Sequence, residues 1–138
     1  MKLNLGCGHN KLDGFINVDN QISCKPDMLM DLEDLPWPLE SNCADQLVLC
    51  HVLEHLGESK TVYLKIIQEL YRVCQHNAQI DITVPHPRHD DFIIDPTHVR
   101  AILPDQFYLF SKKQNKIWKE EGCANNLLAD YLDVDFEV

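Results

Sequence analysis

The first half of the chain alternates between short apolar segments and segments rich in glycine, proline and charged residues. The apolar segments are only a few residues long, which is typical of strands rather than helices. Residues 47–50 are apolar at every position, and such a run predicts a central parallel strand buried on both faces. Residues 80–84 alternate and are rich in β-branched side chains, which also predicts a strand. The other predicted strands are 2–5, 15–18, 28–30 and 132–138.

Helical spacing appears later in the chain. Apolar residues recur every three or four positions after Ser59, which predicts a helix that ends near residues 76–77. These apolar positions are Val62, Ile66, Leu70 and Val73. A second helix is predicted over 105–121, a helical turn over 51–56, and an irregular loop over 86–103.

This order of elements predicts an α/β fold. Strands joined by helical connections form a mostly parallel sheet with helices on both faces, so we expect a Rossmann-like single domain over residues 1–138. The last predicted strand, 132–138, stops with the chain, so the expected fold is short and lacks its last strand. An open sheet edge there would need a second chain to cover it.

Two glycines follow the first predicted strand, and a carboxylate ends the second. Gly6 and Gly8 allow a sharp turn that presents backbone N–H groups, and Asp19 can accept hydrogen bonds from two ribose hydroxyls. This pattern predicts an adenosine-type cofactor site, for a dinucleotide or for S-adenosylmethionine. A dinucleotide site needs a third glycine and a helix N-terminus for the pyrophosphate. Lys11 takes the place of that glycine, and the interval before the second strand is too short for a normal helix, which disfavours a dinucleotide.

Composition narrows the class of partner. Of the 138 residues, 45% are apolar and 25% charged, as is usual for a globular domain, and the net charge is −10. This charge argues against a nucleic-acid partner, and no apolar run is long enough to span a membrane, so we expect neither. The six cysteines show no C-x-x-C spacing and the N-terminus shows no signal peptide. We therefore expect reduced thiols and a cytoplasmic protein.

Three sequence blocks follow the glycine turn, which itself reads LNLGCG at residues 3–8. The blocks are DLEDLPWP at 31–38, ADQLV at 44–48 and HVLEHL at 51–56. This arrangement resembles the type 11 methyltransferases, a branch of the class I S-adenosylmethionine-dependent methyltransferases that leans toward small-molecule substrates. The resemblance implies a cofactor-binding half over about 1–84 and a substrate region over about 85–138. The implied acceptor is a small molecule such as a sugar or another metabolite.

The resemblance also implies roles for the residues of the glycine turn. Gly6, Cys7 and Gly8 would wrap the methionine part of the cofactor, and Asp19 would bind its ribose. Asn4 stands near the position where this motif often carries an acidic residue, and its amide can still form hydrogen bonds. The helix after the first strand is reduced to a turn. The residues that would replace its N-terminus are His9, Asn10 and Lys11.

Three further residues complete the implied cofactor site. Asp31 would accept a hydrogen bond from the exocyclic amine of adenine, and Leu32 would contact the ring. His51, just past a strand, would face the methionine end of the cofactor and the substrate cleft.

Candidates for a catalytic base lie in the loop after the fifth strand, together with His51. A histidine has an unperturbed pKa of about 6.5, which suits proton acceptance at neutral pH. The histidines are His51, His86, His89 and His98, and nearby acids are Asp90, Asp91 and Asp95. Each loop residue also has a purely structural interpretation, as a solvated or turn-capping side chain. We expect no metal, because the spacing matches no standard zinc pattern and Val52 replaces the glutamate of H-E-x-x-H.

The sequence therefore predicts an S-adenosylmethionine-dependent methyltransferase. One alternative is a catalytically inactive methyltransferase-like module that binds the cofactor or serves in assembly. The other alternative is a nucleotide-dependent oxidoreductase.

Overall fold

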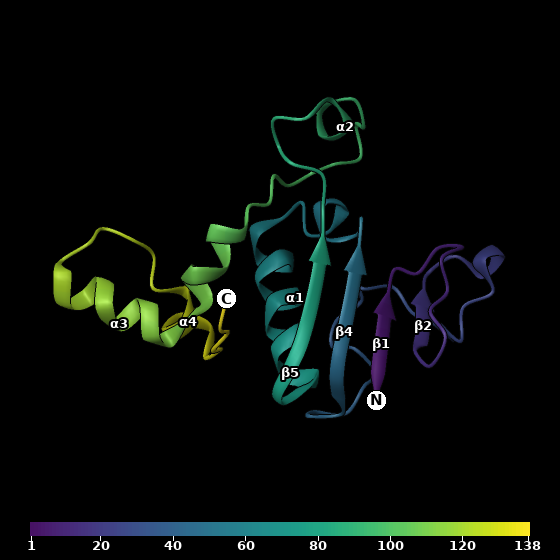
Figure 1. Ribbon diagram of the computed structural model, residues 1–138, viewed down its shortest axis with the longest axis horizontal. Helices are drawn as coiled ribbons and strands as arrows, with labels where there is room; N and C mark the ends of the chain where they lie inside the picture. Colours follow the sequence, from purple (N-terminus) through teal and green to yellow (C-terminus); the bar gives the residue numbers. More distant parts are fainter. The chain divides into compact units, whose positions relative to one another are not determined.

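In the computed structural model, which describes residues 1–138, five parallel strands form one sheet (Figure 1). Their spatial order is β3-β2-β1-β4-β5, so β3 and β5 are the edge strands. The strands are β1 (Lys2–Leu5), β2 (Ile16–Asp19), β3 (Met28–Leu29), β4 (Ala44–Cys50) and β5 (Cys74–Thr83). The predicted α/β, Rossmann-like fold with a parallel sheet is confirmed.

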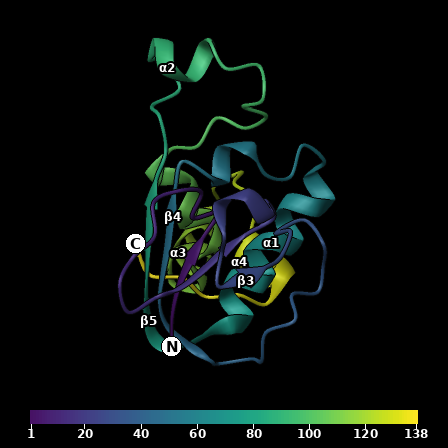
Figure 2. The same cartoon turned by 90° about the vertical axis from the view of Figure 1, so that its right-hand side faces the viewer.

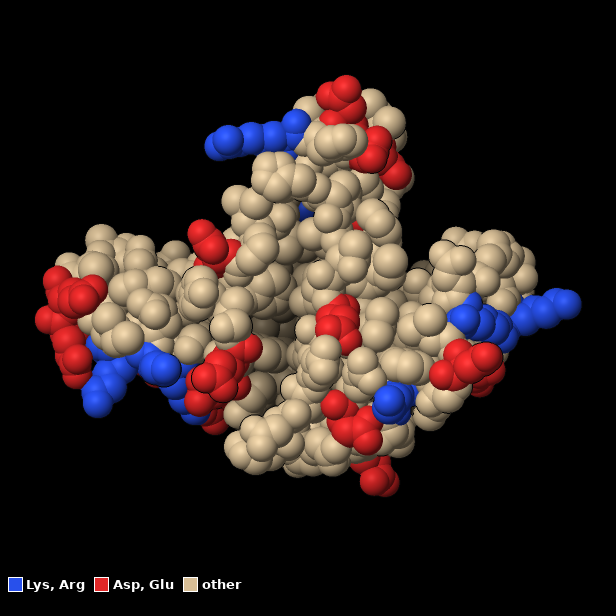
Figure 3. Space-filling model, in the orientation of Figure 1, with Lys and Arg blue, Asp and Glu red and all other residues tan.

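The chain divides into two compact units, Met1–Ala101, which contains the sheet, and Ile102–Val138. The expectation of a single functional domain with a boundary near residue 84 stays a prediction. No helix is long and apolar enough to cross a membrane. On the face drawn in Figure 3, basic side chains are few and lie among acidic ones, and no continuous basic surface is visible there.

One face of the sheet is apolar. The register sets Leu3 beside Leu47 and Leu5 beside Leu49, and all four side chains are at most 1% exposed. The helix α1 (Lys60–Val73) lies beside the sheet (Figure 2), and it buries Ile66, Ile67, Leu70 and Val73. Burial of these side chains is the main stabilising contribution to this unit.

The opposite face of the central strands carries polar residues beside Val48. Side chains alternate along a strand, so the residues between the buried leucines point to the other side. Asn4 stands in register with Asn17, and the amide of Gln46 donates to Asp81 at 3.1 Å. The short glycine turn after β1 replaces the helix that usually follows the first strand, and polar residues stand on this face of the sheet.

The long helix ends, and the fifth strand begins, earlier in the chain than predicted. Ser59 is the N-cap of α1 as predicted, but α1 ends at Val73 because β5 begins at Cys74. Ala44 pairs with Cys74 and Gln46 pairs with Gln79, so the intervening part of β5 is irregular. The regular pairing after Gln79 coincides with the alternating segment that predicted the strand.

The proline-rich loop before β4 is tied to α1. Trp37 is buried, its backbone N–H donates to Glu69 Oε2 at 2.7 Å, and its indole donates to the Leu32 carbonyl at 3.0 Å. Arg72 donates to both Glu69 oxygens at 2.7 Å and to the Trp37 carbonyl at 3.2 Å. The Arg72 hydrogen bonds hold the pKa of Glu69 below its ordinary value, against the effect of burial.

The second unit is helical. Its elements are the 3₁₀ helix η3 (Pro104–Phe110) and the helices α3 (Lys112–Glu121) and α4 (Leu128–Leu132). The predicted helix over 105–121 is therefore broken, because Ser111 is extended and caps α3 by accepting from the Gln114 N–H at 3.3 Å. Asn115, fully buried, donates to the Leu109 carbonyl at 3.1 Å and accepts from the Ala129 N–H at 3.1 Å, which ties the three helices together.

The predicted strand over 132–138 is wrong. Leu132 ends α4, and the following segment has no regular secondary structure and belongs to no sheet. Val134 is buried between exposed aspartates, which explains the alternating pattern. Its backbone bonds are isolated, from Val134 N–H to Ala129 and from Phe136 N–H to Phe110. The expected open edge at this segment is therefore not formed.

Candidate functional site

The two glycines after β1 have different structural tasks. Both have positive φ, +67° at Gly6 and +51° at Gly8, which side chains rarely adopt. A Cβ at Gly6 would lie 2.5 Å from a methyl carbon of Val52, so Gly6 allows the ends of β1 and β4 to approach each other. A Cβ at Gly8 would meet nothing within 4 Å. Gly8 is therefore the position where the turn is open to a ligand.

Asp19 meets the glycine turn at the carboxyl edge of the sheet. Its Oδ2 accepts from the Gly8 N–H at 2.8 Å, and its Oδ1 accepts from the Gln21 N–H at 2.8 Å. A carboxylate offers about four lone-pair sites, so each oxygen keeps acceptor capacity after these bonds. The half-exposed side chain can therefore bind a diol while the backbone fixes its orientation.

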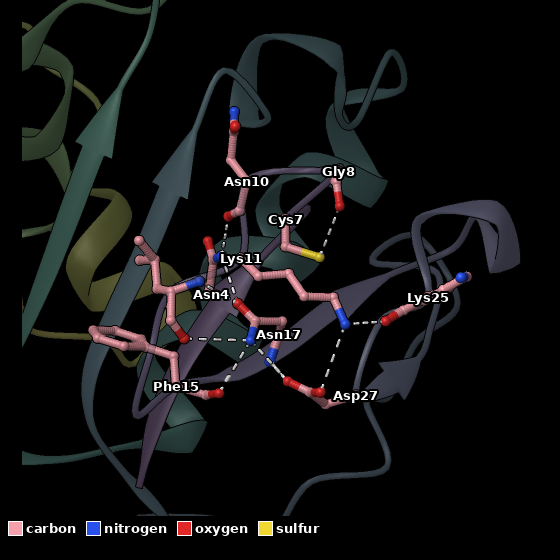
Figure 4. A network of polar contacts seen from close by, with 10 residues as sticks. Asn4, Cys7, Gly8, Asn10, Lys11, Phe15, Asn17, Lys25 and Asp27 are labelled. Carbon is pink, nitrogen blue, oxygen red and sulfur yellow. Dashed lines mark hydrogen bonds and ion pairs between the residues drawn. The ribbon is translucent and has the colours of Figure 1, made fainter.

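Asn17 organises the turn from below (Figure 4). Its Oδ1 accepts from the Leu12 N–H at 2.8 Å and from Asn4 Nδ2 at 2.9 Å. Its Nδ2 donates to Asp27 Oδ2 at 2.7 Å, and Asp27 also accepts from the Asn17 N–H at 2.8 Å. These bonds hold the pKa of Asp27 below its ordinary value, with Lys11 adding a smaller effect. The side chain at the centre of β2 thus connects both ends of the turn to the segment before β3.

Four other residues expected at the cofactor differ in their burial. They are Asn4, Cys7, His9 and Asn10. Asn4 is buried and donates to the Asn10 carbonyl at 2.9 Å, so its amide supports the turn from inside. Cys7 is buried, its Sγ donates to the Gly8 carbonyl at 3.4 Å, and burial together with the Asp19 charge raises the pKa of the thiol. The side chains of His9 and Asn10 are exposed.

Asp31 and Leu32 follow the third strand. The Asp31 carboxylate accepts from the Glu33 N–H at 2.9 Å and from Asn20 Nδ2 at 3.3 Å, so it caps its own turn and joins the residue after Asp19. Leu32 is buried, and its carbonyl accepts from the Trp37 indole. The two residues differ in access, because only the Asp31 side chain is exposed.

His51 extends the β4–β5 pairing by one residue. Its N–H donates to the Thr83 carbonyl at 2.8 Å, and its φ is +55°, an uncommon conformation for a non-glycine residue. The His51 side chain is 60% exposed, and its Nδ1 lies 3.5 Å from Oε1 of the buried Glu54. Because Val52 contacts the Gly6 position, His51 stands next to the glycine turn.

The structure does not gather the three loop histidines into one group. His86 accepts from the Arg88 N–H at 3.2 Å, and His89 caps α2 (Asp90–Ile93) by accepting from the Asp91 N–H at 3.2 Å. Both rings are exposed and form local turns. His98 differs, because its side chain is only 8% exposed and its ring lies 4.6 Å from that of His55, centroid to centroid.

This geometry accompanies a likeness to a methyltransferase of known structure. The crystal structure of a SAM-dependent methyltransferase from Archaeoglobus fulgidus superposes with a TM-score of 0.65. The sequences are 21% identical, and the match covers 95% of this chain and 59% of that one. No protein-family model and no curated protein matches the chain.

The likeness shows that the chain has the fold of a S-adenosylmethionine-dependent methyltransferase. This agrees with the class I resemblance of the sequence, while membership of the type 11 branch stays a prediction. The chain spans about three fifths of the length of the neighbour, 59%.

Two polar residues of the site region were not singled out from the sequence, although each carried a signal. Asn17 stands in the middle of an apolar strand, and Glu54 directly follows two apolar residues in HVLEHL. A polar residue buried among apolar ones must find partners, which makes it a marker of a specific network. Asp27 carried no such signal, because it lies in a loop and meets Asn17 only in the fold.

Proposed function

We propose that this chain is a class I methyltransferase domain, of the type 11 branch, that transfers a methyl group from S-adenosylmethionine to a small-molecule acceptor. The observation that carries the proposal is the contact between Asp19 and the Gly8 N–H at 2.8 Å. It brings an open glycine turn and a diol-binding carboxylate to the same edge of a parallel sheet. In open α/β sheets, ligands bind at this carboxyl edge.

The residues of this edge fit the parts of the cofactor. Asp19 would accept from the ribose hydroxyls, and the open backbone at Gly8 would lie along the methionine part. The exposed carboxylate of Asp31 is available to an amine on the adenine side. Asn4 and Leu32 are buried, so we assign them supporting roles beneath the site rather than direct contacts.

Bound S-adenosylmethionine supplies a methyl group on a sulfonium, a good leaving group. The protein's main contribution is to hold the acceptor in line with that methyl group. An acceptor that arrives protonated must also lose a proton, and a histidine is suited to receive it.

Among the predicted histidines, we assign the role of base to His51. Its Nδ1 lies 3.5 Å from Oε1 of the buried Glu54 carboxylate, so Nε2 lies on the far side of the ring from Glu54. The ring is exposed and stands beside the glycine turn, where the methyl group would lie. His86 and His89 cap local turns, and the His98 side chain is only 8% exposed, so these three fit the role less well.

Calorimetric titration with S-adenosylmethionine and S-adenosylhomocysteine tests the cofactor assignment. We expect binding at micromolar Kd, weakened about tenfold or more in Asp19→Asn, because a hydrogen bond to a charged acceptor contributes about 1.5–3 kcal/mol. Glu40→Gln, another exposed acidic residue of the same unit, is the control and should bind as the native chain does. Binding of NAD in place of these ligands would contradict the proposal and favour an oxidoreductase.

Transfer of a labelled methyl group to a panel of small hydroxyl and amine compounds tests the catalytic part. We expect His51→Gln to lower kcat by about 100-fold or more with an unchanged Kd for the cofactor, as for loss of a general base. His86→Gln is the matched control and should retain activity. Cofactor binding without transfer to any acceptor would favour the inactive binding module.

A further inference from the structure

A buried carboxylate and two histidines converge beyond the end of β4, outside the glycine turn. Glu54 is fully buried, and neither of its carboxylate oxygens accepts a hydrogen bond. One ligand atom each from Glu54, His55 and His98 lie within 4.8 Å of one another. Because a buried carboxylate without partners is costly, this cluster needs a positive group to compensate it.

The hydrogen bonds of the two histidines select the same ring nitrogen for a ligand. His98 Nδ1 lies 2.8 Å from the Phe92 carbonyl, which can only accept, so Nδ1 carries the proton. The Thr97 hydroxyl donates to Asp95 at 2.6 Å and accepts from His55 Nδ1 at 3.0 Å, so this Nδ1 also carries its proton. These bonds leave Nε2 of both rings for another partner, and Nε2 of His98 lies 3.7 Å from Asp95 Oδ2, beyond hydrogen-bond distance.

This is the arrangement of a histidine that binds a metal ion. Such a histidine usually donates its second ring N–H to a carbonyl or another acceptor, which fixes the tautomer and the ring orientation. Phe92 and Thr97 supply those acceptors, and the Phe92 ring also stacks on His98 at 5.2 Å between centroids. The surroundings of the cluster thus support the ligand atoms before any ion is bound.

We propose that Glu54, His55 and His98 bind a divalent transition-metal ion, with Zn²⁺ as the reference ion. Two imidazoles and one carboxylate form a ligand set that suits Zn²⁺ or Fe²⁺ and leaves coordination positions open. Bonds of about 2.0–2.2 Å place neighbouring ligand atoms roughly 3.0–3.5 Å apart. Small side-chain rotations therefore close the cluster around the ion. The site runs against the sequence-based expectation of no metal, because spacing cannot relate His98 to residues 54–55.

His51 is the other group that faces Glu54. Its Nδ1 is 3.5 Å from Oε1, beyond a strong hydrogen bond, and the ring is mostly exposed to solvent. A carboxylate has two oxygens, so contact of one with His51 is compatible with the other binding a metal ion. The two proposals therefore share the Glu54 carboxylate, with one oxygen facing His51 and the other available to the ion.

The ion would fasten the loop after β5 to the segment after β4. The backbone already joins them, because the Val99 and Arg100 N–H groups donate to the Glu54 carbonyl at 2.9 and 3.2 Å. The ligand set adds a side-chain connection at the same place. Bound metal should therefore stabilise the fold, because an ion that binds only the folded state raises the unfolding temperature.

The test is titration of the full chain, without S-adenosylmethionine, with Zn²⁺ and with Co²⁺. We expect one equivalent of Zn²⁺ to bind and to raise Tm. Co²⁺ should give visible absorption bands typical of nitrogen and oxygen ligands, without a thiolate charge-transfer band. Glu54→Gln and His98→Gln should each weaken Zn²⁺ binding by about 10- to 100-fold or more. His89→Gln changes an exposed histidine of the same loop and should bind Zn²⁺ like the native chain.

Three results would overturn the metal site. They are no stoichiometric binding by the folded native chain, equal affinity in Glu54→Gln, and a thiolate band that assigns the ion to cysteines. Circular dichroism of each variant establishes that it is folded, and the native chain with and without chelator gives a measurement that needs no variant. Because cofactor is absent from the titration, failure here leaves the methyltransferase proposal untouched.

Discussion

The two parts of the sheet's carboxyl edge are built in different ways. At β1 and β2, residues 4–27 form a turn held by hydrogen bonds between close neighbours in the chain, with Asn17 at the centre. At β4, residues 51–57 meet a distant segment, 92–100, through the Glu54 carbonyl, the Thr97 side chain and the Arg100 guanidinium. The glycine turn and Asp19 of the first part can be predicted from the sequence, whereas a cluster assembled across the fold cannot.

The largest expected losses of stability come from substituting the glycine in each part that lies against another segment of the chain. A Cβ at Gly57 would lie 2.6 Å from the backbone of Tyr63, and one at Gly6 would lie 2.5 Å from a stiff valine side chain. We expect Gly57→Ala to lower the free energy of unfolding by about 3 kcal/mol or more, and Gly6→Ala by about 2–4 kcal/mol. Urea unfolding of both variants measures these losses.

Gly8→Ala is the matched comparison for Gly6→Ala. In this variant only the positive φ lowers the free energy of unfolding, by about 1–2 kcal/mol, because nothing lies within 4 Å of the added Cβ. The added methyl group should reduce the magnitude of the free energy of S-adenosylmethionine binding more than it lowers the free energy of unfolding. Equal stability losses at Gly6 and Gly8 would show that the two glycines do not have separate tasks.

Asn17→Asp should break the local network without changing its shape. The new carboxylate would face the Asp27 carboxylate at the 2.7 Å now spanned by a hydrogen bond. We expect a loss of about 2–4 kcal/mol at pH 7, because a buried donor is replaced by a like charge. Asn17→Asp should also weaken binding of the cofactor, although Asn17 is not among the residues proposed to contact it. Native stability in urea would contradict the central role of Asn17.

Each of the two parts contains an aspartate whose pKa is lowered, and we expect this to have the smallest effect on stability. Hydrogen bonds from Asn17 lower the pKa of Asp27, and those from Thr97, with smaller effects of His98 and His55, lower the pKa of Asp95. A lowered folded-state pKa adds stability above the unfolded value near 3.8, and that stability is lost as pH falls through the folded pKa. We therefore expect NMR midpoints below 3.8 for both carboxyl groups.

Thr97→Val tests which contacts set the lower pKa. It removes the hydroxyl that gives the largest effect on Asp95, so the midpoint of Asp95 should rise toward 3.8 while that of Asp27 stays in place. A rise at both aspartates, or at neither, would contradict the separate origins of the two shifts.

The sequence predicted the sheet and the glycine turn because their causes are local. The first apolar runs, the turn glycines and the strand-terminal Asp19 lie within residues 2–50, the alternating run lies at 80–84, and each has its own physical signature. The segment 132–138 was misread because alternating burial, here Val134 between exposed aspartates, also occurs in a segment that pairs with no strand. The helix predicted over 105–121 is broken because Ser111 is extended and caps a new helix that begins at Lys112.

The candidate site was only partly predictable for the same reason. Asp19 and Gly8 were predicted to act together, and the structure brings them into contact. The histidines of the loop were treated as one group, but His98 lies with His55 and Glu54, away from the turn-capping His86 and His89. Only the tertiary fold selects His98 from a set of residues of the same type.

The central claim is that the glycine turn and Asp19 bind S-adenosylmethionine, and NMR titration with S-adenosylhomocysteine tests it most directly. In the labelled native chain, we predict that the amide signals of Gly6, Gly8, Asp19 and His51 shift most as the ligand is added. Signals of the second unit's helix α3 should stay in place. A folded chain whose largest shifts lie away from residues 6–8 and 19, or that shows no shifts at millimolar ligand, would contradict the claim.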